Sequence, residues 1–185
     1  MHLESLQVTE LCSERLILMP FTISICENIL QNNYTKLEQL NLVRGKGWPD
    51  ADVIETLPRI IVNLSKVDAP TGFESWMIIK KSTREIIGDI GFKGYNFVGR
   101  SCDIGYGIIE AERKQGFAVE AAAELINWAF TKETLEEVTA CCLIENISST
   151  KLLKKLNFSE LTRDSTMIYW SLLRENKSVS YTHLR

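Results

Sequence analysis

The feature that most constrains the fold is a pair of apolar segments separated by one amphipathic helix. Residues 102–109 and 137–143 have the composition of buried strands, and residues 116–132 between them carry small and aliphatic side chains on one helical stripe. A strand, a helix and a second strand of this length form a crossover unit, in which the two strands run parallel through a right-handed connection. The sequence therefore predicts a parallel strand pair at this place in the chain.

The turn between the first of these strands and the helix has the composition of an anion site. It consists of Arg113, Lys114, Gln115, Gly116, Phe117 and Ala118. The first N–H groups of a helix have no intrahelical partner, and the helix dipole favours a negative charge there. We predict that this turn holds a pyrophosphate.

The rest of the chain predicts further strands and helices around this unit. Strands are expected at residues 15–20, 75–80, 86–92 and 166–173, and helices are expected from residue 22 or 24 to about 32, from 50 or 52 to about 66, and from 148 or 149 to 157. The strands between residues 75 and 109 follow one another through polar turns, which favours an antiparallel meander.

Length and composition indicate one domain. The chain has 185 residues, of which 45% are hydrophobic and 24% charged, and it contains no linker or low-complexity tract. We expect a single domain over residues 1–185, with a core at 12–173 and a frayed tail at 174–185. No apolar run reaches the ~18–20 residues that span a bilayer, and the N-terminus has no secretory signal, so a cytoplasmic protein without membrane attachment is expected. The net charge of −3 argues against a nucleic-acid partner.

Histidine and cysteine usage argues against several kinds of catalysis. His2 and His183 lie at the two ends of the chain, and the five cysteines show no metal-ligand spacing. Ser–His and Cys–His catalysis and a zinc site are therefore not expected. The cysteines are expected to be reduced thiols, and no metal is expected.

The glycine-rich basic segment 43–50 allows two interpretations. It contains Gly45, Lys46 and Gly47, but Trp48 and Pro49 follow in place of a helix start. The segment is either an exposed flexible loop or a loop over a substrate pocket, with Trp48 as an aromatic wall.

A second motif lies beyond the crossover unit. Asn146-Ile147-Ser148-Ser149 precedes Leu152-Leu153-Lys154-Lys155-Leu156-Asn157-Phe158. With the order of elements, this motif and the turn at 113–118 resemble the GNAT superfamily of N-acetyltransferases, in the branch of ribosomal-protein N-terminal acetyltransferases. That family has an Arg/Gln-x-x-Gly-x-Gly/Ala loop, and this branch an Asn-x-x-Ser…Leu-x-Lys-Leu-Gly-Phe pattern. Asp103-Ile104-Gly105-Tyr106 also resembles the branch, and the resemblance spans residues 12–173.

The resemblance implies an α+β fold and a cofactor. The fold has a mixed, mostly antiparallel twisted sheet with one parallel, splayed strand pair, flanked by about four helices. The cofactor is acetyl-CoA, which serves as the acyl donor. Its pyrophosphate is expected on the backbone of residues 114–118 and on the side chains of Arg113 and Lys114, and its pantetheine arm on Asn146. Ile108 and Ile109 lie at the strand end, where a backbone N–H near Ile108 would stabilise the oxyanion.

The catalytic residues are expected among a few polar side chains. Many members of the family have a tyrosine on the late helix as the general acid, but Leu153 occupies that position here. The branch resemblance transfers this role to Ser149. Asp103 is the first candidate for the general base, because the resembled branch has an acidic residue there and burial in an apolar strand would raise its pKa. Asp89 is the second candidate, with a solvent-facing carboxylate as the alternative. Tyr106 is expected to contact the substrate.

Two functions remain open from the sequence. The first is transfer of an acetyl group from acetyl-CoA to a primary amine, on a protein N-terminus or a small molecule, by direct attack in a ternary complex. The second is a non-catalytic acyl-CoA-binding or sensing domain that kept the loop. The sequence does not decide whether the chain forms a homodimer, which is common in the family.

Overall fold

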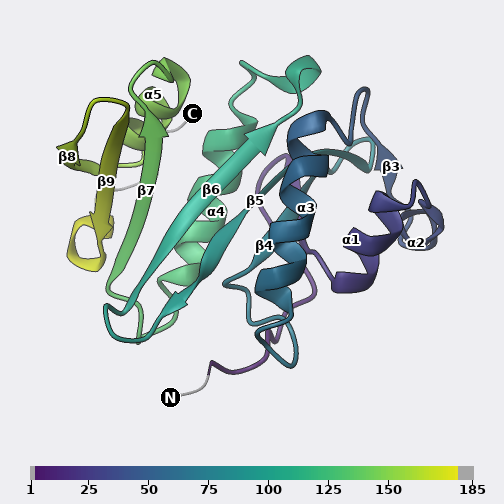
Figure 1. Ribbon diagram of the computed structural model, residues 1–185, viewed down its shortest axis with the longest axis horizontal. Coiled ribbons are helices and arrows are strands. Elements are labelled where there is room, and N and C mark those ends of the chain that lie inside the picture. The colour runs from purple at the N-terminus through teal and green to yellow at the C-terminus, as the bar shows by residue number, and fades with distance from the viewer. Residues whose placement is uncertain (1–2, 179–185) are drawn as a thin grey trace.

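The sheet of this protein opens between two of its central strands. A computed structural model describes residues 3–178 (Figure 1). The strands are β1 (Leu11–Cys12), β2 (Leu16–Pro20), β3 (Val43–Arg44), β4 (Ser75–Lys80), β5 (Glu85–Asn96), β6 (Ser101–Ile108), β7 (Glu137–Leu143), β8 (Ser159–Arg163) and β9 (Met167–Leu173). Their order is β1-β2-β4-β5-β6-β7-β9-β8, and β3 pairs with β5 beside this path.

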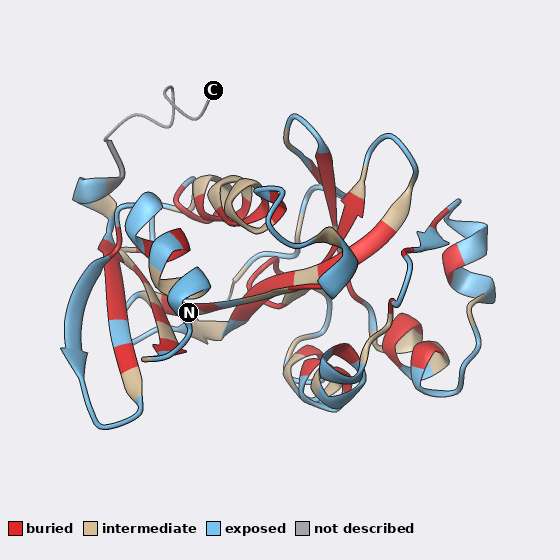
Figure 2. Ribbon diagram, turned by 90° about the horizontal axis from the view of Figure 1, so that it is seen from above, coloured by how far each residue is buried: buried red, intermediate tan, exposed pale blue. Residues whose placement is uncertain are grey.

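Helices cover both faces of the sheet. They are α1 (Ile23–Leu30), α2 (Thr35–Gln39), α3 (Ala51–Leu64), α4 (Phe117–Ala129) and α5 (Ile147–Lys155), with 3-10 turns η1 (Glu110–Glu112) and η2 (Arg174–Ser178). Figure 2 shows α4 on one face of the sheet, and α1 and α3 on the other. Each of the two long helices turns its apolar stripe inward. The buried side chains are Val53, Leu57, Ile60 and Leu64 on α3, and Phe117, Ala121, Ala122, Leu125, Ile126 and Ala129 on α4.

The predicted fold class is confirmed. The sheet is mixed and mostly antiparallel. The predicted parallel pair is formed by β6 and β7, which precede and follow α4 in the chain. Five α-helices flank it within residues 3–178, one more than the approximate number expected, because α2 forms a separate short helix. The two-residue β3 adds a short parallel contact with β5, and β8 adds an edge strand. Neither strand was predicted, because β3 is two residues long and β8 is exposed throughout.

The parallel pair is short, and this shortness creates the splay. β6 and β7 are paired only at Ser101↔Glu137, Cys102↔Val138 and Asp103↔Thr139. Beyond these positions β6 stays with β5 as far as Ile108, and β7 stays with β9 as far as Leu143. Each strand therefore keeps its outer neighbour while the inner edges separate, as the diverging arrows in Figure 1 show. The separated edges carry backbone N–H and C=O groups that a ligand can pair with.

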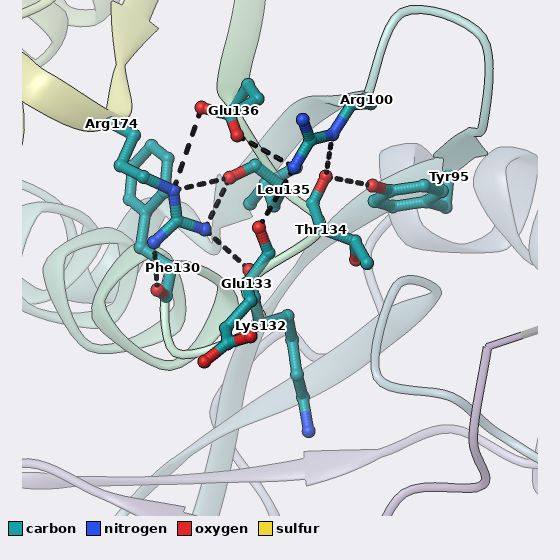
Figure 3. Close-up of polar contacts among 9 residues, drawn as sticks. All are labelled: Tyr95, Arg100, Phe130, Lys132, Glu133, Thr134, Leu135, Glu136 and Arg174. Carbon is teal, nitrogen blue, oxygen red and sulfur yellow. Dashed lines mark hydrogen bonds and ion pairs between the residues drawn. The ribbon is translucent and has the colours of Figure 1, made fainter.

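The connection from α4 to β7 is held by side chains from other parts of the chain (Figure 3). Arg174 donates from Nη1 to the carbonyl oxygen of Phe130 (2.9 Å) and from Nε to that of Leu135 (2.8 Å). Arg100 donates from Nε to the carbonyl oxygen of Thr134 (2.9 Å), which also accepts from the Tyr95 hydroxyl (2.6 Å). These bonds satisfy backbone acceptors that have no place in a helix or strand. They thereby fix the point from which β7 starts beside β6.

The first residue of the predicted C-terminal tail makes several hydrogen bonds. Arg174 opens the tail at 174–185 and hydrogen-bonds the α4–β7 connection. Residues 179–185 of that segment lie outside the described residues. Within residues 3–178, no helix has the length and apolar character needed to cross a bilayer.

We expect Arg174→Ala to destabilise the protein by about 2 kcal/mol, because several partly buried carbonyl oxygens lose a charged donor at once. Urea unfolding followed by circular dichroism would measure the change. Arg163→Ala is the matched control, since Arg163 is an exposed side chain that pairs with Glu160, and its effect on stability is expected to be much smaller. Equal effects of the two substitutions would contradict the role given to Arg174.

Candidate active site

The loop before α4 has the backbone shape of an anion cradle. Lys114 and Gly116 both have left-handed backbone conformations, with φ of +64° and +83°. Gly116 is the N-cap residue of α4 and provides no capping side chain. The amides of Phe117 and Ala118 at the start of the helix therefore have no intrahelical partner. A negatively charged ligand at this point would meet free N–H groups and the positive end of the helix dipole.

A clamp from the N-terminal strands, formed by Ser13, Arg15 and Glu120, holds this loop in place. Arg15 donates from Nη1 to the carbonyl oxygen of Gln115 (3.0 Å), and its guanidinium lies 4.5 Å from the centre of the Phe117 ring. Glu120 on α4 accepts from Arg15 Nε (2.7 Å), the Arg15 backbone N–H (2.7 Å) and the Ser13 hydroxyl (2.7 Å). The clamp thus joins β1 and β2 to the first turn of α4.

No local sequence pattern indicates this clamp. Arg15 and Glu120 are 105 residues apart, and Glu120 falls on the polar stripe of its helix, where a solvent-facing side chain is expected. Burial alone would raise the pKa of Glu120, but the hydrogen bonds from Ser13 and Arg15 and the charge of Arg15 outweigh it and hold this pKa below its usual value. Glu120 is therefore ionised at neutral pH, and its carboxylate is engaged by Ser13 and Arg15.

The end of β6 offers backbone groups to the splay. The Ile109 N–H donates to the carbonyl oxygen of Ile87 on β5 (3.0 Å). Successive residues of a strand direct their N–H and C=O groups to opposite edges, so the groups of Ile108 point toward β7, where the sheet is open. Arg113 confirms this direction, because its Nε donates to the Ile108 carbonyl oxygen (2.9 Å). The Ile108 N–H is left facing the open splay between β6 and β7.

A cavity of about 600 Å³ occupies the splay. It is lined by the loop and the N-terminus of α4, by Tyr106, Gly107 and Ile108 of β6, and by Asn146, Ser148 and Ser149 at the start of α5. Asn146 Oδ1 accepts from the Ser149 N–H (3.0 Å) and caps α5, so its amide nitrogen remains available to a ligand. Burial raises the pKa of Tyr106 to about 12, although a hydrogen bond with Ser149 lowers it. Two hydroxyl groups thus meet at the inner end of this cavity.

A groove of about 670 Å³ reaches the same point from the α3 side of the sheet. Both spaces are lined by Asp52, Tyr106 and Gly107. Asp89 also lines the groove and lies opposite Gly107 in the β5–β6 register. Burial raises the pKa of Asp89 to about 7, and the nearby carboxylates of Asp50 and Asp52 contribute in the same direction. A carboxyl group with this pKa can exchange a proton near neutral pH.

Asp103 and Trp48 lie elsewhere. Asp103 is at the closed end of the splay, opposite Thr139, and it accepts from the Thr139 hydroxyl (3.1 Å) and pairs with Lys93 (2.5 Å). It lines a separate cavity of about 760 Å³. Trp48 is buried and lines a cavity of about 480 Å³ with Tyr34 and Arg44. The structure therefore groups Asp89, Tyr106, Asn146 and Ser149 with the loop at 113–118, and it places Asp103 and Trp48 apart from that group.

Asp52 is a site residue that the sequence had suggested only as a possible helix cap. Asp50 caps α3 instead, because its Oδ1 accepts from the Val53 N–H (3.0 Å). Asp52 in the first turn of α3 is left to line the groove and the splay cavity together. Within residues 3–178, no three histidine, cysteine, aspartate or glutamate side chains are placed to hold a metal ion.

We expect Glu120→Gln to destabilise the protein by about 1–2 kcal/mol at pH 7, since the clamp loses its charge. The folded pKa of Glu120 lies below its unfolded value, so this stability is present above pH ~4.3 and is lost as the pH falls through the folded pKa. The difference between wild type and variant should therefore shrink in acid. Urea unfolding at pH 7, 4 and 3 would measure it.

Glu124→Gln is the control for this pH dependence. Glu124 lies one turn further along α4, and its pKa is raised, first by burial and also by the charge of Glu120, although Lys81 opposes the shift. Ionisation of Glu124 therefore costs stability, and its replacement should not destabilise the protein at pH 7. The same pH dependence in both variants would contradict the clamp.

The chain matches a known family over most of its length. Residues 15–159 match the model of the acetyltransferase (GNAT) domain. An uncharacterized N-acetyltransferase of Bacillus subtilis strain 168, YjdG, is 32% identical over 158 residues, which cover 85% of this chain and 94% of that protein. A second uncharacterized N-acetyltransferase of that strain, YoaA, is 33% identical over 85 residues, 46% of this chain and 48% of that protein.

Solved structures have the same fold. An acetyltransferase of the GNAT family from Bacillus anthracis has a TM-score of 0.63 at 18% identity, with 90% of this chain and 99% of that chain covered. The ribosomal L7/L12 alpha-N-protein acetyltransferase RimL, solved in complex with coenzyme A, has a TM-score of 0.64 at 13% identity, with 90% and 99% covered. The family match, the relative and the splayed sheet agree, and the chain belongs to the GNAT acetyltransferase family, as an acetyl-CoA-dependent acyltransferase.

Proposed function

We propose that this protein transfers an acetyl group from acetyl-CoA to a primary amine, by direct attack of the amine on the thioester in a ternary complex. The observation that carries the proposal is the meeting of two spaces at Tyr106 and Gly107. The splay cavity extends from the anion cradle to these two residues. The groove reaches them from the α3 face of the sheet, and Asp89 lies beside the groove. A donor and an acceptor can thus be bound together and react without a covalent enzyme intermediate.

The donor side is built mainly from backbone. The pyrophosphate of acetyl-CoA would bind to the N–H groups of residues 114–118, with Lys114 and Gln115 at the rim and the Arg113 guanidinium between the loop and the end of β6. The pantetheine arm would follow the free edge of β6 and meet the Asn146 amide. The thioester carbonyl would then accept from the Ile108 N–H, which stabilises the oxyanion as it forms.

Asp89 is the general base that the geometry favours. The attacking nitrogen forms a bond to the thioester carbon and must lose a proton, which passes to the Asp89 carboxylate directly or through one water. A pKa of about 7 leaves a large fraction of Asp89 ionised at neutral pH and makes it basic enough to take that proton. Asp103 has less to support it as the base, because its carboxylate is engaged by Lys93 and Thr139 at the closed end of the splay.

The departing sulfur needs a proton, and we assign its supply to Ser149, which lines the splay cavity. As the carbon–sulfur bond breaks, the thiolate of coenzyme A takes the proton of the Ser149 hydroxyl. The hydrogen bond between Ser149 and the Tyr106 phenol stabilises the serine oxygen as it gives up this proton. Tyr106 stays protonated at neutral pH, so it can serve as a hydrogen-bond donor in that step. This pair compensates for the leucine at position 153, where many family members have a tyrosine.

Amines are supported as the acceptor class by proteins with the same fold. These proteins include a ribosomal-protein-S5-alanine acetyltransferase from Vibrio fischeri and a spermidine N-acetyltransferase chimera. One of these acceptors is a protein and the other is a small polyamine. Both support an amino group as the nucleophile, and they do not specify the kind of molecule that carries it. The two carboxylates at the inner end of the groove, Asp52 and Asp89, suit a group that arrives as an ammonium ion.

Two measurements made together test the function. Isothermal titration with acetyl-CoA should show binding, and a thiol-release assay with a panel of primary amines should show acetyl-CoA consumption that depends on the amine. Gly116→Trp should abolish the binding, because a bulky side chain at a left-handed position would distort and fill the cradle. Tight binding with no thiol release from any amine would indicate the acyl-CoA-binding or sensing function instead.

We expect Asp89→Asn to lower kcat by about 10²–10⁴-fold, which is the range for loss of a general base, while acetyl-CoA affinity is retained. In the wild type, kcat/KM should rise with pH and level off above about pH 7, because only the ionised carboxylate accepts a proton. The variant should lose this rise. Steady-state kinetics from pH 5.5 to 9 would measure both effects.

Asp103→Asn is the matched comparison, since it makes the same chemical change on the neighbouring strand. It should weaken the contact with Lys93 and Thr139 and lower stability, while the rise of kcat/KM near pH 7 persists. If the rise disappears in Asp103→Asn and remains in Asp89→Asn, Asp103 is the base and the present assignment is wrong.

A further inference from the structure

One side of α3 carries a polar stripe that lies over the sheet. Asp52, Thr56, Arg59 and Asn63 line the groove of about 670 Å³. The stripe continues just past the helix to Lys66, which with Asn63 lines the adjoining cavity of about 760 Å³. The spacing of four, three, four and three residues places all five on one helical face. This face therefore borders a binding space, next to the apolar stripe that packs on the core.

The floor of the groove leaves room for a ligand with some length. It is formed partly by Gly105 and Gly107 of β6. A β-carbon at Gly105 would meet nothing within 4 Å, and one at Gly107 would meet only Asp89 Oδ1, at 3.7 Å. The groove and the adjoining cavity share Asn63 and Lys93 in their walls. An acceptor can therefore extend along α3 away from the reacting end.

Charge changes sign along this path. Asp52 and Asp89 lie at the reacting end, where the groove meets the splay. Arg59 is seven residues beyond Asp52, which is about 10 Å along a helix. No carboxylate lies within ion-pair distance of Arg59 in the part of the chain that the structure describes. Lys93 is nearby, and its charge and that of Arg59 repel each other. Two cations thus lie near each other at the wall of the groove, and only Lys93 has a carboxylate partner, Asp103.

From this arrangement we infer that the acceptor carries an anionic group on the order of 10 Å from its reacting amine, which is the separation of Asp52 and Arg59 along the axis of α3, and that Arg59 selects for that group. The inference rests on the acyl transfer proposed above and specifies its acceptor. The amine end faces Asp52 and Asp89, and the distal carboxylate or phosphate pairs with Arg59. A linear amino acid and the amino-terminal end of a peptide with an acidic side chain share this chemistry. In an extended peptide, the fourth residue lies about 10 Å from the first.

An acceptor panel tests the chemistry and separates the two sources. The first arm is a series of linear aminoalkanoates of increasing length, compared with monoamines and diamines of matched length. The second arm is a set of short peptides with glutamate, glutamine or lysine at the fourth position. We expect kcat/KM to be about two- to fivefold higher for the anionic member of each matched set, which corresponds to one added charge pair in an exposed site. Within the aminoalkanoates, the advantage should peak at one chain length.

Charge variants of Arg59 test the residue. Arg59→Gln should remove the preference for anionic acceptors, mainly through a rise of about two- to fivefold in their KM with little change in kcat. Arg59→Glu should turn the preference toward the diamines and the lysine peptide. Arg163→Gln is the control, because it removes an arginine from the exposed edge strand β8, and it should leave the preference as in the wild type. Thermal unfolding of each variant would confirm that the fold is kept.

The outcomes separate this inference from the proposed function. Loss of the preference in Arg59→Gln and its reversal in Arg59→Glu would support the inference. Acetylation of amines without regard to a distal anion, or a preference that survives in Arg59→Gln, would overturn it and leave acetyl transfer to amines intact. Acetyl-CoA binding without acetylation of any member of the panel would overturn the proposed function, and this inference with it.

Discussion

The candidate site of this protein depends on the short length over which strands β6 and β7 pair. β6 and β7 share backbone contacts at three register positions and then separate, because each has an outer neighbour that it follows in a different direction. A continuous sheet would leave no inner edges, and the Ile108 N–H would be consumed by β7. The separation exposes these groups in the interior of the domain, where a bound ligand can replace the missing strand. The cradle before α4 lies at the mouth of this opening because α4 starts where β6 ends.

Contacts far apart in the sequence hold the opening in its shape. Arg174 and Arg100 fix the α4–β7 connection at the closed end, and the clamp of Ser13, Arg15 and Glu120 fixes the loop at the open end. The pKa values of two carboxyl groups near the site differ because their surroundings differ. Glu120 accepts three hydrogen bonds and stays ionised, while Asp89 is buried near other carboxylates and has a pKa of about 7. The same functional group therefore serves as a structural anchor in one place and as a candidate base in another.

Much of the architecture could be predicted from short-range patterns. The apolar runs at 102–109 and 137–143 and the amphipathic helix between them specified the crossover, and the loop at 113–118 was placed at its turn. The assignment of the base could not be made in the same way. Asp103 and Asp89 both lie on strands with apolar neighbours, and strand periodicity does not show where a sheet opens. Asp103 sits where β6 and β7 are still paired, whereas Asp89 lies opposite Gly107, where they have separated. Trp48 similarly lies in a loop segment, and only the structure shows that its side chain is buried.

The sequence by itself determined most of the strands and helices, the crossover, the turn with its glycine, and the family resemblance. These follow from periodicity, from backbone preferences and from motifs of neighbouring residues, all of which are local properties of the chain. Only the tertiary structure decided which polar side chains share a space. Arg15 reaches Glu120, Asp52 and Asp89 line one groove, and Arg59 borders the same groove without a carboxylate partner within the described residues. Their proximity depends on how α3, α4 and the sheet pack together, and packing brings together residues whose separation along the chain carries no signal of their contact.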